Sequence, residues 1–333
     1  MSQHPTTSTP EHALVAAATL GAAAIGALVA RLPATALAAA GPDAPAFLHG
    51  QLANDVTGLP VGGAARSLHL NHRGHAIAEA SVLRRGASEF LVVVDDDRGA
   101  WVLESLESHV IFDQVTLAAR PELALLTLQG AGAAAALPTA PEPGRIVALE
   151  LAGAEVLAYP RRRSAHGGFD LLVEAERADA VLEALAGAGA LAVAPAAIAA
   201  LRVLGLTPTA AGEGGEGVLP QEAGLEDALS YRKGCYLGQE IMARIEARGN
   251  LRRGLARLGL SAVPAPGERD LRHEGRVVGR LGTVAQVAEE DGSTATLALA
   301  VVRNDLPEGA ELEVGGASAR ALPADAVARY NRG

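Results

Sequence analysis

The chain has 333 residues, of which 49% are hydrophobic and only 3% aromatic, and its formal net charge is −10. This length allows two or three domains with cores of their own. The acidic balance and the scarcity of aromatic side chains argue against a broad nucleic-acid surface and against a platform that stacks bases. The single cysteine excludes an internal disulfide and fits a reducing cytoplasm, where we expect a monomer.

The N-terminal segment raises the question of a membrane span. Residues 1–10 are expected to be disordered, and residues 13–30 are apolar and rich in alanine and glycine. No lysine or arginine precedes this run, so the basic region of a signal peptide is missing. Alanine and glycine also contribute little insertion energy. The run therefore predicts a helix packed by small side chains, with no membrane association.

Two stretches of strands and helices follow. The first is expected to contain helices over 44–52 and 98–109 and strands over 64–70, 75–83, 89–94, 114–118 and 123–128. The second is expected to contain strands over 146–159 and 168–173 and helices over 176–186 and 194–204. Strand-rich units that each end in a helix indicate an α+β body built from two similar halves.

From residue 251 the pattern changes to short alternating strands. They are expected over 254–260, 276–279, 283–288, 294–302, 311–314 and 317–322. Strands at this spacing predict a small β-barrel. The chain then divides into an N-terminal tail and helix (1–30), the body (31–250), the C-terminal β-barrel (251–325) and a tail (326–333).

The most distinctive chemistry lies in residues 231–240. The only lysine, Lys233, and the only cysteine, Cys235, flank Gly234 there. A helix expected over 239–247 places Cys235 just before a helix N-terminus, and this position, together with the ammonium of Lys233, favours the thiolate over the thiol. The residues alone indicate a reactive, exposed thiol on a loop shaped by glycines. The alternative is that both residues are accidents of composition.

Four segments carry a resemblance to a known family. Residues 233–240 read KGCYLGQE, which resembles the K-G-C-Y-x-G-Q-E signature of the YgfZ-like folate-binding proteins, relatives of the aminomethyltransferase (GcvT) of the glycine cleavage system. Residues 41–56 resemble that family's G-x-D-A-x-x-F-L-x-G-Q-x-T-x-D-V segment, with Ala53 in the threonine position. Residues 71–74 resemble its N-x-K-G turn, and residues 219–225 resemble the stretch that leads to the signature.

The resemblance implies a GcvT-like body that binds tetrahydrofolate, followed by a β-barrel. It also implies an accessory role for iron–sulfur enzymes, including enzymes that modify tRNA, with these iron–sulfur proteins as partners. The site residues it suggests are Cys235 and Lys233 as the catalytic pair, Gly234, Tyr236, Gly238, Gln239 and Glu240 as the rest of the motif, and Asp55, Asn71 and Arg248 as candidates for folate binding.

Two other functions remain open. A folate-dependent aminomethyltransferase would need an acidic residue beside the folate, and residues 95–97, three aspartates, lie near the corresponding strand end. A non-catalytic folate sensor would need the fold but not the thiol.

Two further groups of residues have simpler interpretations. His49, His69, His72 and His75 are scattered over a helix and a hairpin without a paired cysteine, so we expect no metal site. The arginines at 161–163 could meet folate glutamates or RNA phosphate, but their pattern is more typical of a solvated turn.

Overall fold

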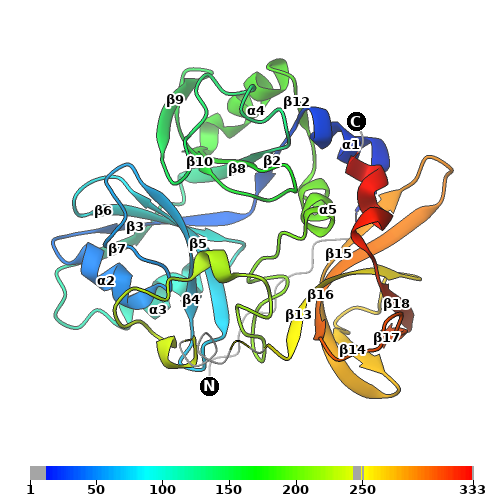
Figure 1. Ribbon diagram of the computed structural model, residues 1–333. Helices are drawn as coiled ribbons and strands as arrows, with labels where there is room; N and C mark the ends of the chain where they lie inside the picture. The colour runs from blue at the N-terminus through cyan, green and yellow to red at the C-terminus, as the bar shows by residue number, and fades with distance from the viewer. Residues whose placement is uncertain (1–12, 243–248, 250, 332–333) are drawn as a thin grey trace.

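The computed structural model describes residues 13–242, 249 and 251–331. Figure 1 shows three lobes: two that each consist of a sheet with helices on one face, and a third formed by the β-strands near the C-terminus. The first two lobes are the halves of the body, and the third is the barrel.

The first half is a five-stranded antiparallel sheet whose outer face is covered by two helices. Its strands, in spatial order, are β4 (Ala64–Leu70), β5 (Ala76–Arg84), β6 (Glu89–Asp95), β3 (Ala34–Ala40) and β7 (Thr116–Ala119). Side chains alternate between the two faces of a strand. Val82 and Val92 therefore pack outward against Phe47 of α2 (Ala44–Gln51) and Leu106 of α3 (Gly99–Glu107).

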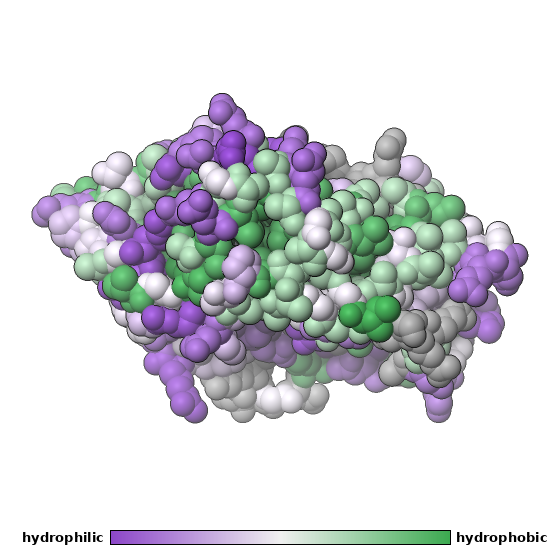
Figure 2. All heavy atoms as spheres, turned by 90° about the horizontal axis from the view of Figure 1, so that it is seen from above, coloured by the Kyte–Doolittle hydropathy of each residue, from purple (hydrophilic) through white to green (hydrophobic). Residues whose placement is uncertain are grey.

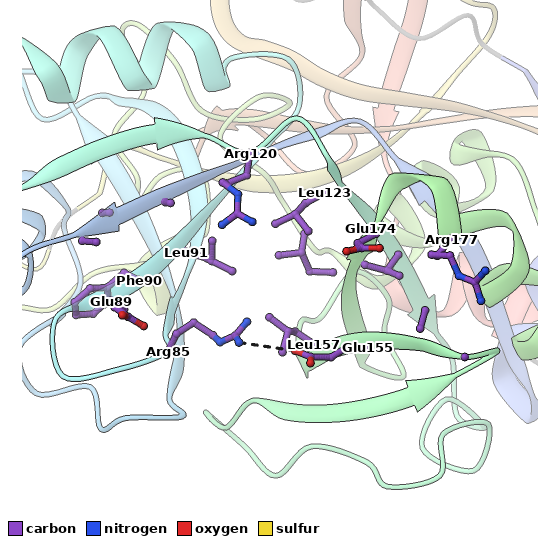
Figure 3. Close-up of a pocket in the computed structure, with 17 residues that line it drawn as sticks. Arg85, Glu89, Phe90, Leu91, Arg120, Leu123, Glu155, Leu157, Glu174 and Arg177 are labelled. Atoms are coloured by element: carbon purple, nitrogen blue, oxygen red, sulfur yellow. Dashed lines mark ion pairs between the residues drawn. The ribbon is translucent and has the colours of Figure 1, made fainter.

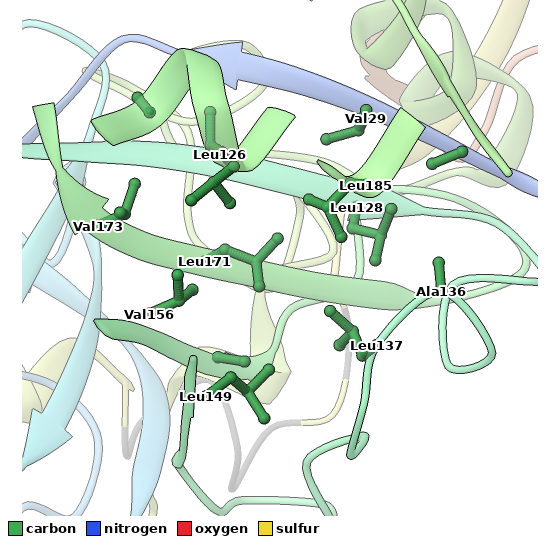
Figure 4. Packing of buried hydrophobic residues seen from close by; sticks show 14 of the residues in the cluster. Val29, Leu126, Leu128, Ala136, Leu137, Leu149, Val156, Leu171, Val173 and Leu185 are labelled. Carbon is green, nitrogen blue, oxygen red and sulfur yellow. The ribbon is translucent and has the colours of Figure 1, made fainter. Parts of the chain in front are cut away.

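The second half repeats this arrangement. Its strands, in spatial order, are β9 (Val147–Leu151), β10 (Ala154–Pro160), β11 (Gly168–Glu174), β8 (Leu123–Gln129), β2 (Ala27–Leu32) and β12 (Ala190–Ala192). Helix α4 (Ala178–Gly187), which follows the short 3₁₀ helix η1 (Ala175–Arg177), covers the outer face. Figure 4 shows Leu185 of α4 over Leu128 and Leu171 of the sheet.

The order of strands confirms the expected pair of similar halves. In each half a three-stranded meander, β4-β5-β6 or β9-β10-β11, is followed in space by the strand that precedes it in sequence, β3 or β8. The fifth position is filled by β7 in the first half and by the N-terminal strand β2 in the second. Only Pro33 separates β2 from β3, so the chain passes directly from one sheet to the other.

The inner faces of the two sheets pack on each other through a mixed interface. Its apolar part contains Leu83, Leu91, Leu125 and Tyr159. Further along the same strands, the inward positions become polar and charged, as at Glu79, Asp95, Thr127, Gln129 and Asp170, all buried. The body therefore has an apolar seam that continues into a buried polar region.

The C-terminal lobe is a closed six-stranded barrel, as expected. Its strands are β13 (Arg253–Leu260), β14 (Asp270–His273), β15 (Arg276–Ala288), β16 (Thr294–Arg303), β17 (Leu312–Val314) and β18 (Ala317–Ala321). The pairing of β15 with β16 closes it. Helix α5 (Pro195–Gly205) joins the barrel to the body because Ile198 and Leu201 share one core with Val287 and Leu299.

The helix expected over residues 13–30 is wrong for half of that run. The structure has β1 (Leu14–Ala16), α1 (Ala17–Ile25) and β2 there. β1 pairs in parallel with β15 of the barrel, and β2 lies between β8 and β12. These partners are distant in sequence, so a local pattern of small apolar residues does not reveal them.

The last described residues also pack into the structure. The 3₁₀ helix η3 (Ala324–Asn331) carries Val327 and Tyr330, which are buried in the same cluster as Leu20 of α1. Both ends of the described chain therefore lie on the side of the molecule where the barrel meets the second half, as Figure 1 shows for α1 and the C-terminus.

In the described residues, no helix is long and apolar enough to cross a membrane. Seen from the end that carries α1 and α4, the surface mixes green areas with purple ones (Figure 2). Among the large apolar side chains, Ile25 and Leu191 are exposed. This molecular surface fits the composition, in which alanine and leucine supply most of the apolar residues.

Candidate functional site

The motif segment lies against the first half of the body. It follows the short 3₁₀ helix η2 (Glu226–Ala228), and Tyr236 and Met242 are buried in a cluster with Leu68 and Leu70 of β4. In Figure 1 this part of the chain, drawn in yellow-green, runs beside β4 and the α2–α3 side of the first half. The motif is thus a docked loop, and Cys235 and Gly234 are on its exposed side.

Lys233 fastens this loop to the end of α2. Its side chain is buried, and its ammonium donates hydrogen bonds to the backbone oxygens of His49, Leu52 and Asn54, the last at 3.1 Å. The last carbonyls of a helix have no partner within the helix and carry the negative end of its dipole. The ammonium also lies 4.7 Å from the centre of the Tyr236 ring.

The structure therefore gives Lys233 a different role from the expected approach to the Cys235 sulfur. An ammonium has three protons to donate, and three carbonyls accept them here. Burial lowers the pKa of Lys233 to about 8, against the opposing charge of Asp55. Lys233 is the anchor of the loop.

The glycines of the motif allow the loop to lie directly on the 71–74 turn. Gly238 has φ +85°, and a Cβ there would be 2.8 Å from the backbone oxygen of Asn71. Conversely, a Cβ on Gly74 would be 2.7 Å from the Met242 side chain. The helix after the motif begins at Gln239, as expected, and is described as far as Met242. Its expected continuation over 243–247 lies outside the described residues.

Among the candidates for folate binding, Asp55 and Asn71 both lie close to the motif loop. Asp55 is held by Thr57 and by the N–H of Gly58, which lowers the pKa of its carboxyl group, and it pairs with His49 at 3.2 Å. The side-chain oxygen of Asn71 accepts hydrogen bonds from the N–H groups of Arg73 and His75, so it shapes the turn. Arg248 lies outside the described residues.

Sequence reasoning missed a buried ionic network that joins the two halves. Arg161 and Arg163, 5% and 4% exposed, come from the second half and pair with Glu79 and Asp95 of the first. Arg163 also binds Asp170, and Arg66 also binds Glu79. Burial alone would raise the pKa values of Glu79 and Asp95, but the neighbouring guanidinium groups hold both well below their usual range.

The interpretation of residues 161–163 as a solvated turn is therefore wrong for two of the three arginines. Only Arg162 is exposed. The alternation of β10 places Leu157, Tyr159 and Arg161 on its inner face, and this signal was available in the sequence. The sequence does not reveal Glu79 and Asp95 as acidic partners, because they lie on the other sheet.

Residues 95–97 separate into three environments. Asp95 belongs to the buried network, Asp97 is exposed, and Asp96 is partly buried with φ +70°. Burial raises the pKa of Asp96 to about 6, although Arg98 opposes the shift. A left-handed, non-glycine residue with such a carboxyl group is a recognised sign of a functional position.

The histidines do not gather into a metal centre. His69 is buried, and its ring nitrogens lie 3.1 Å from the backbone oxygen of Gln51 and 2.9 Å from the hydroxyl of Ser105, so it is satisfied within the core. Among the described residues, no group of three or more His, Cys, Asp or Glu side chains could hold a metal ion.

A cavity of about 650 Å³ lies elsewhere, at the outer end of the seam between the two sheets. Its walls include Leu91, Leu123 and Leu157, and Figure 3 shows Arg85 and Arg120 at its sides, with Arg85 pointing toward Glu155. None of the residues predicted from the motif lines it.

Comparison with known proteins places this architecture in a family. Residues 34–233 match the model of the GCVT N-terminal domain. The tRNA-modifying protein YgfZ of Klebsiella pneumoniae (strain 342) is 31% identical over 306 residues, which cover 83% of this chain and 88% of the relative. The protein of the same name from Cronobacter sakazakii is 31% identical over 288 residues, covering 81% and 82%.

A solved structure shows the same fold. The glycine cleavage system aminomethyltransferase T from Bartonella henselae superposes with a TM-score of 0.73 at 20% identity, covering 91% of this chain and 88% of the other. By sequence and by fold, the chain belongs to the YgfZ family of proteins with a GCVT N-terminal domain.

Proposed function

We propose that this protein is a folate-binding accessory protein for iron–sulfur enzymes, including enzymes that modify tRNA, and that Cys235 is its reactive group. The observation that carries this proposal is the docked loop: the only thiol of the chain is exposed on a segment that Lys233 fastens to α2. An exposed thiol on a fixed loop can meet a group on another protein. The relatives named as tRNA-modifying proteins support the process in which it acts.

The protein is expected to act on tRNA through such enzymes, since its own charge opposes RNA binding. With a formal net charge of −10 it repels the phosphate backbone, and it has only 3% aromatic residues to stack on bases. We propose that it works as a monomer in the cytoplasm, with iron–sulfur proteins as its partners.

The residues around Asp96 fit a reduced folate. Arg269 of the barrel is partly buried, and among the described residues its guanidinium has no hydrogen-bond or ion-pair partner. Burial lowers its pKa, and Arg280, Glu213 and Arg98 are close enough to act on it electrostatically. An unpaired arginine between further arginines suits the glutamate carboxylates of folate, and the Asp96 carboxyl group suits the N–H groups of the pterin.

Bound tetrahydrofolate would supply a carrier for a one-carbon group. Asp96 would orient the ring, and its raised pKa would allow it to hold or release a proton near neutral pH. Arg98 would keep Asp96 in place, since its backbone N–H donates to the Asp96 carboxyl group at 2.8 Å.

The same residue favours a second candidate, a folate-dependent aminomethyltransferase. Among residues 95–97, Asp96 is the one that is neither bound into the buried network nor fully exposed. Turnover with an aminomethyl donor and tetrahydrofolate would support this candidate, and it would then have to persist in Cys235→Ala. A folate sensor without chemistry would bind folate and also keep its function in Cys235→Ala.

The test combines complementation with calorimetry. Cells lacking the gene receive the wild type, Cys235→Ala or Cys235→Ser, and modified tRNA nucleosides and iron–sulfur enzyme activities are measured. We expect both cysteine variants to fail while still binding a tetrahydrofolate derivative at micromolar level. Arg269→Gln is expected to weaken folate binding, with the exposed Arg162→Gln as its control. Full complementation by Cys235→Ala would reject the reactive role of the thiol, and absence of heat with every reduced folate would reject the ligand.

A further inference from the structure

The loop docked by Lys233 lies against a histidine from α2. His49 is two residues before the last residue of α2, and its Nε2 lies 3.8 Å from the position that a Cβ on Gly234 would take. The imidazole therefore lies beside Gly234, the residue before Cys235. The Cα of Cys235 lies about 3.8 Å from that of Gly234, so the exposed thiol belongs to the residue next to the one that the ring approaches.

The other ring nitrogen of His49 is fixed by a short acidic loop. Nδ1 lies 3.2 Å from a carboxylate oxygen of Asp55 and 3.1 Å from the hydroxyl oxygen of Thr57. The Thr57 hydroxyl donates to the same Asp55 oxygen, so its lone pairs remain free to accept. The backbone N–H of Thr57 also approaches Nδ1, but at 3.4 Å. The hydrogen bond from the Thr57 N–H needs Nδ1 as an acceptor, whereas the two oxygens at shorter distances favour the tautomer with its proton on Nδ1.

This tautomer leaves Nε2 with its lone pair toward the Cys235 loop. In the part of the chain that the structure describes, no group hydrogen-bonds to Nε2. Burial and the nearby Lys233 lower the pKa of His49, while Asp55 opposes them, so the ring is neutral at physiological pH. A neutral imidazole oriented by a carboxylate activates a cysteine nucleophile when its free nitrogen reaches the thiol.

We propose that His49, oriented by Asp55, accepts the proton of the Cys235 thiol. The inference rests on Cys235 being the reactive group of the proposed function, and it assigns the base that the sequence around the motif lacks. The S–H bond of Cys235 breaks and its proton moves to Nε2, which leaves a thiolate beside an imidazolium. Lys233 is a positioning residue in this scheme, because its hydrogen bonds to α2 hold Gly234 against His49.

The charged groups near His49 determine the pH range in which its imidazole is neutral and can accept a proton. Lys233 comes from the motif loop and Asp55 from the segment after α2, and they act on the ring in opposite directions. Because Lys233 is largely charged below pH 8, it disfavours the imidazolium.

Alkylation of the full-length protein with iodoacetamide tests this inference. The thiolate forms the new C–S bond, iodide leaves with the electrons of the C–I bond, and the imidazolium returns its proton to solvent. Each mass adduct reports Cys235, because the chain has no other thiol. We expect His49→Gln to react about ten-fold more slowly than the wild type at pH 7, with a smaller loss for Asp55→Asn.

The pH profile separates chemistry from a purely structural role. The wild-type rate is expected to fall at acidic pH, where the imidazole takes up its own proton, and this inflection should vanish in His49→Gln. Free imidazole should partly restore the rate of His49→Ala. The matched control is His166→Gln, an exposed histidine in the second half, which should follow the wild type.

Two outcomes would overturn the inference. One is a His49→Gln rate equal to that of the wild type between pH 5 and 9, and the other is a slow His49→Ala that imidazole does not restore. Neither result depends on folate or on a client protein. The complementation result for Cys235→Ala would therefore stand or fall independently.

Discussion

Lys233 is the residue whose role changes most between sequence and structure. The sequence suggests an activating charge beside Cys235, whereas the structure shows an ammonium bound to three backbone carbonyls at the end of α2. A lysine suits this position because its compact ammonium fits between carbonyls that the planar guanidinium of arginine would span differently. The local geometry thus explains why this arginine-rich chain has its only lysine at position 233.

We predict that Lys233 titrates near pH 8 in the folded protein, because burial disfavours its charged form. Labelled lysine gives one side-chain NMR signal, since the chain has one lysine. Asp55→Asn should lower the midpoint further, because Asp55 opposes the shift. A midpoint near the ordinary value of about 10.4 would show that the ammonium is solvated and that the loop is not anchored as described.

Asp96→Asn should stabilise the protein at neutral pH. The carboxyl group has a pKa of about 6 in the folded state and about 3.9 when unfolded, so the native state binds more protons between these values and stability falls as pH rises through them. Asparagine removes this cost and also tolerates φ +70°. After allowance for solvent screening we expect a gain of about 1 kcal/mol at pH 7.

The gain from Asp96→Asn should disappear at pH 4, where the wild-type carboxyl group is protonated in the native state. Urea unfolding at both pH values measures it, with the exposed Asp97→Asn as control. An equal effect at pH 4 and pH 7 would mean that ionisation is not the cause.

At the scale of elements, the contact between the motif loop and the 71–74 turn depends on glycine. Gly238→Ala would place a methyl group 2.8 Å from a backbone oxygen at a residue with φ +85°. We expect a loss of more than about 2 kcal/mol and faster proteolysis near residue 235. Gly217→Ala is the matched control: it has φ +79° but nothing within 4 Å, so its loss should stay near 1 kcal/mol. Equal losses would show that the loop is not packed on the turn.

The strands and helices differ in whether a short stretch of sequence is enough to predict them. Strands β4 to β6 and helices α2 to α5 were predicted within a few residues, because alternation, turns and helical periodicity are properties of short windows. Strands β2, β3 and β12 consist largely of alanine and leucine and gave no such signal. They exist because β8, β6 and β2 offer them hydrogen bonds from distant parts of the chain.

The candidate site follows the same division. The motif, its glycines and the start of the helix at Gln239 could be predicted from the sequence. His49 could not, because it lies 186 positions before Cys235 in the chain, and only the docking of the loop on α2 brings it beside Gly234. The same holds for Glu79 and Asp95, the partners of Arg161 and Arg163 that lie on a different sheet.

At the scale of the whole molecule, the two halves are joined by an apolar seam and by the buried ionic network. The apolar part is non-directional, so it leaves the relative position of the sheets loosely specified. The arginines fix it, since Arg163 binds Asp95 of the first half and Asp170 of the second at the same time. Because Glu79 and Asp95 have lowered pKa values, their contribution is present above about pH 4 and is lost as pH falls further.

Arg163→Met should therefore be among the most destabilising single changes in the body. It leaves Asp170, which is fully buried, without the guanidinium that binds both of its oxygens. An uncompensated buried charge costs about 3–5 kcal/mol. The double variant Arg163→Met/Asp170→Leu removes that charge and should regain most of the loss, whereas Arg162→Met, the exposed neighbour in the same run, should cost less than about 1 kcal/mol. Urea unfolding at pH 7 measures all three. If Arg162→Met and Arg163→Met lose equal stability, or if the double variant is weaker than Arg163→Met alone, the network does not hold the halves together.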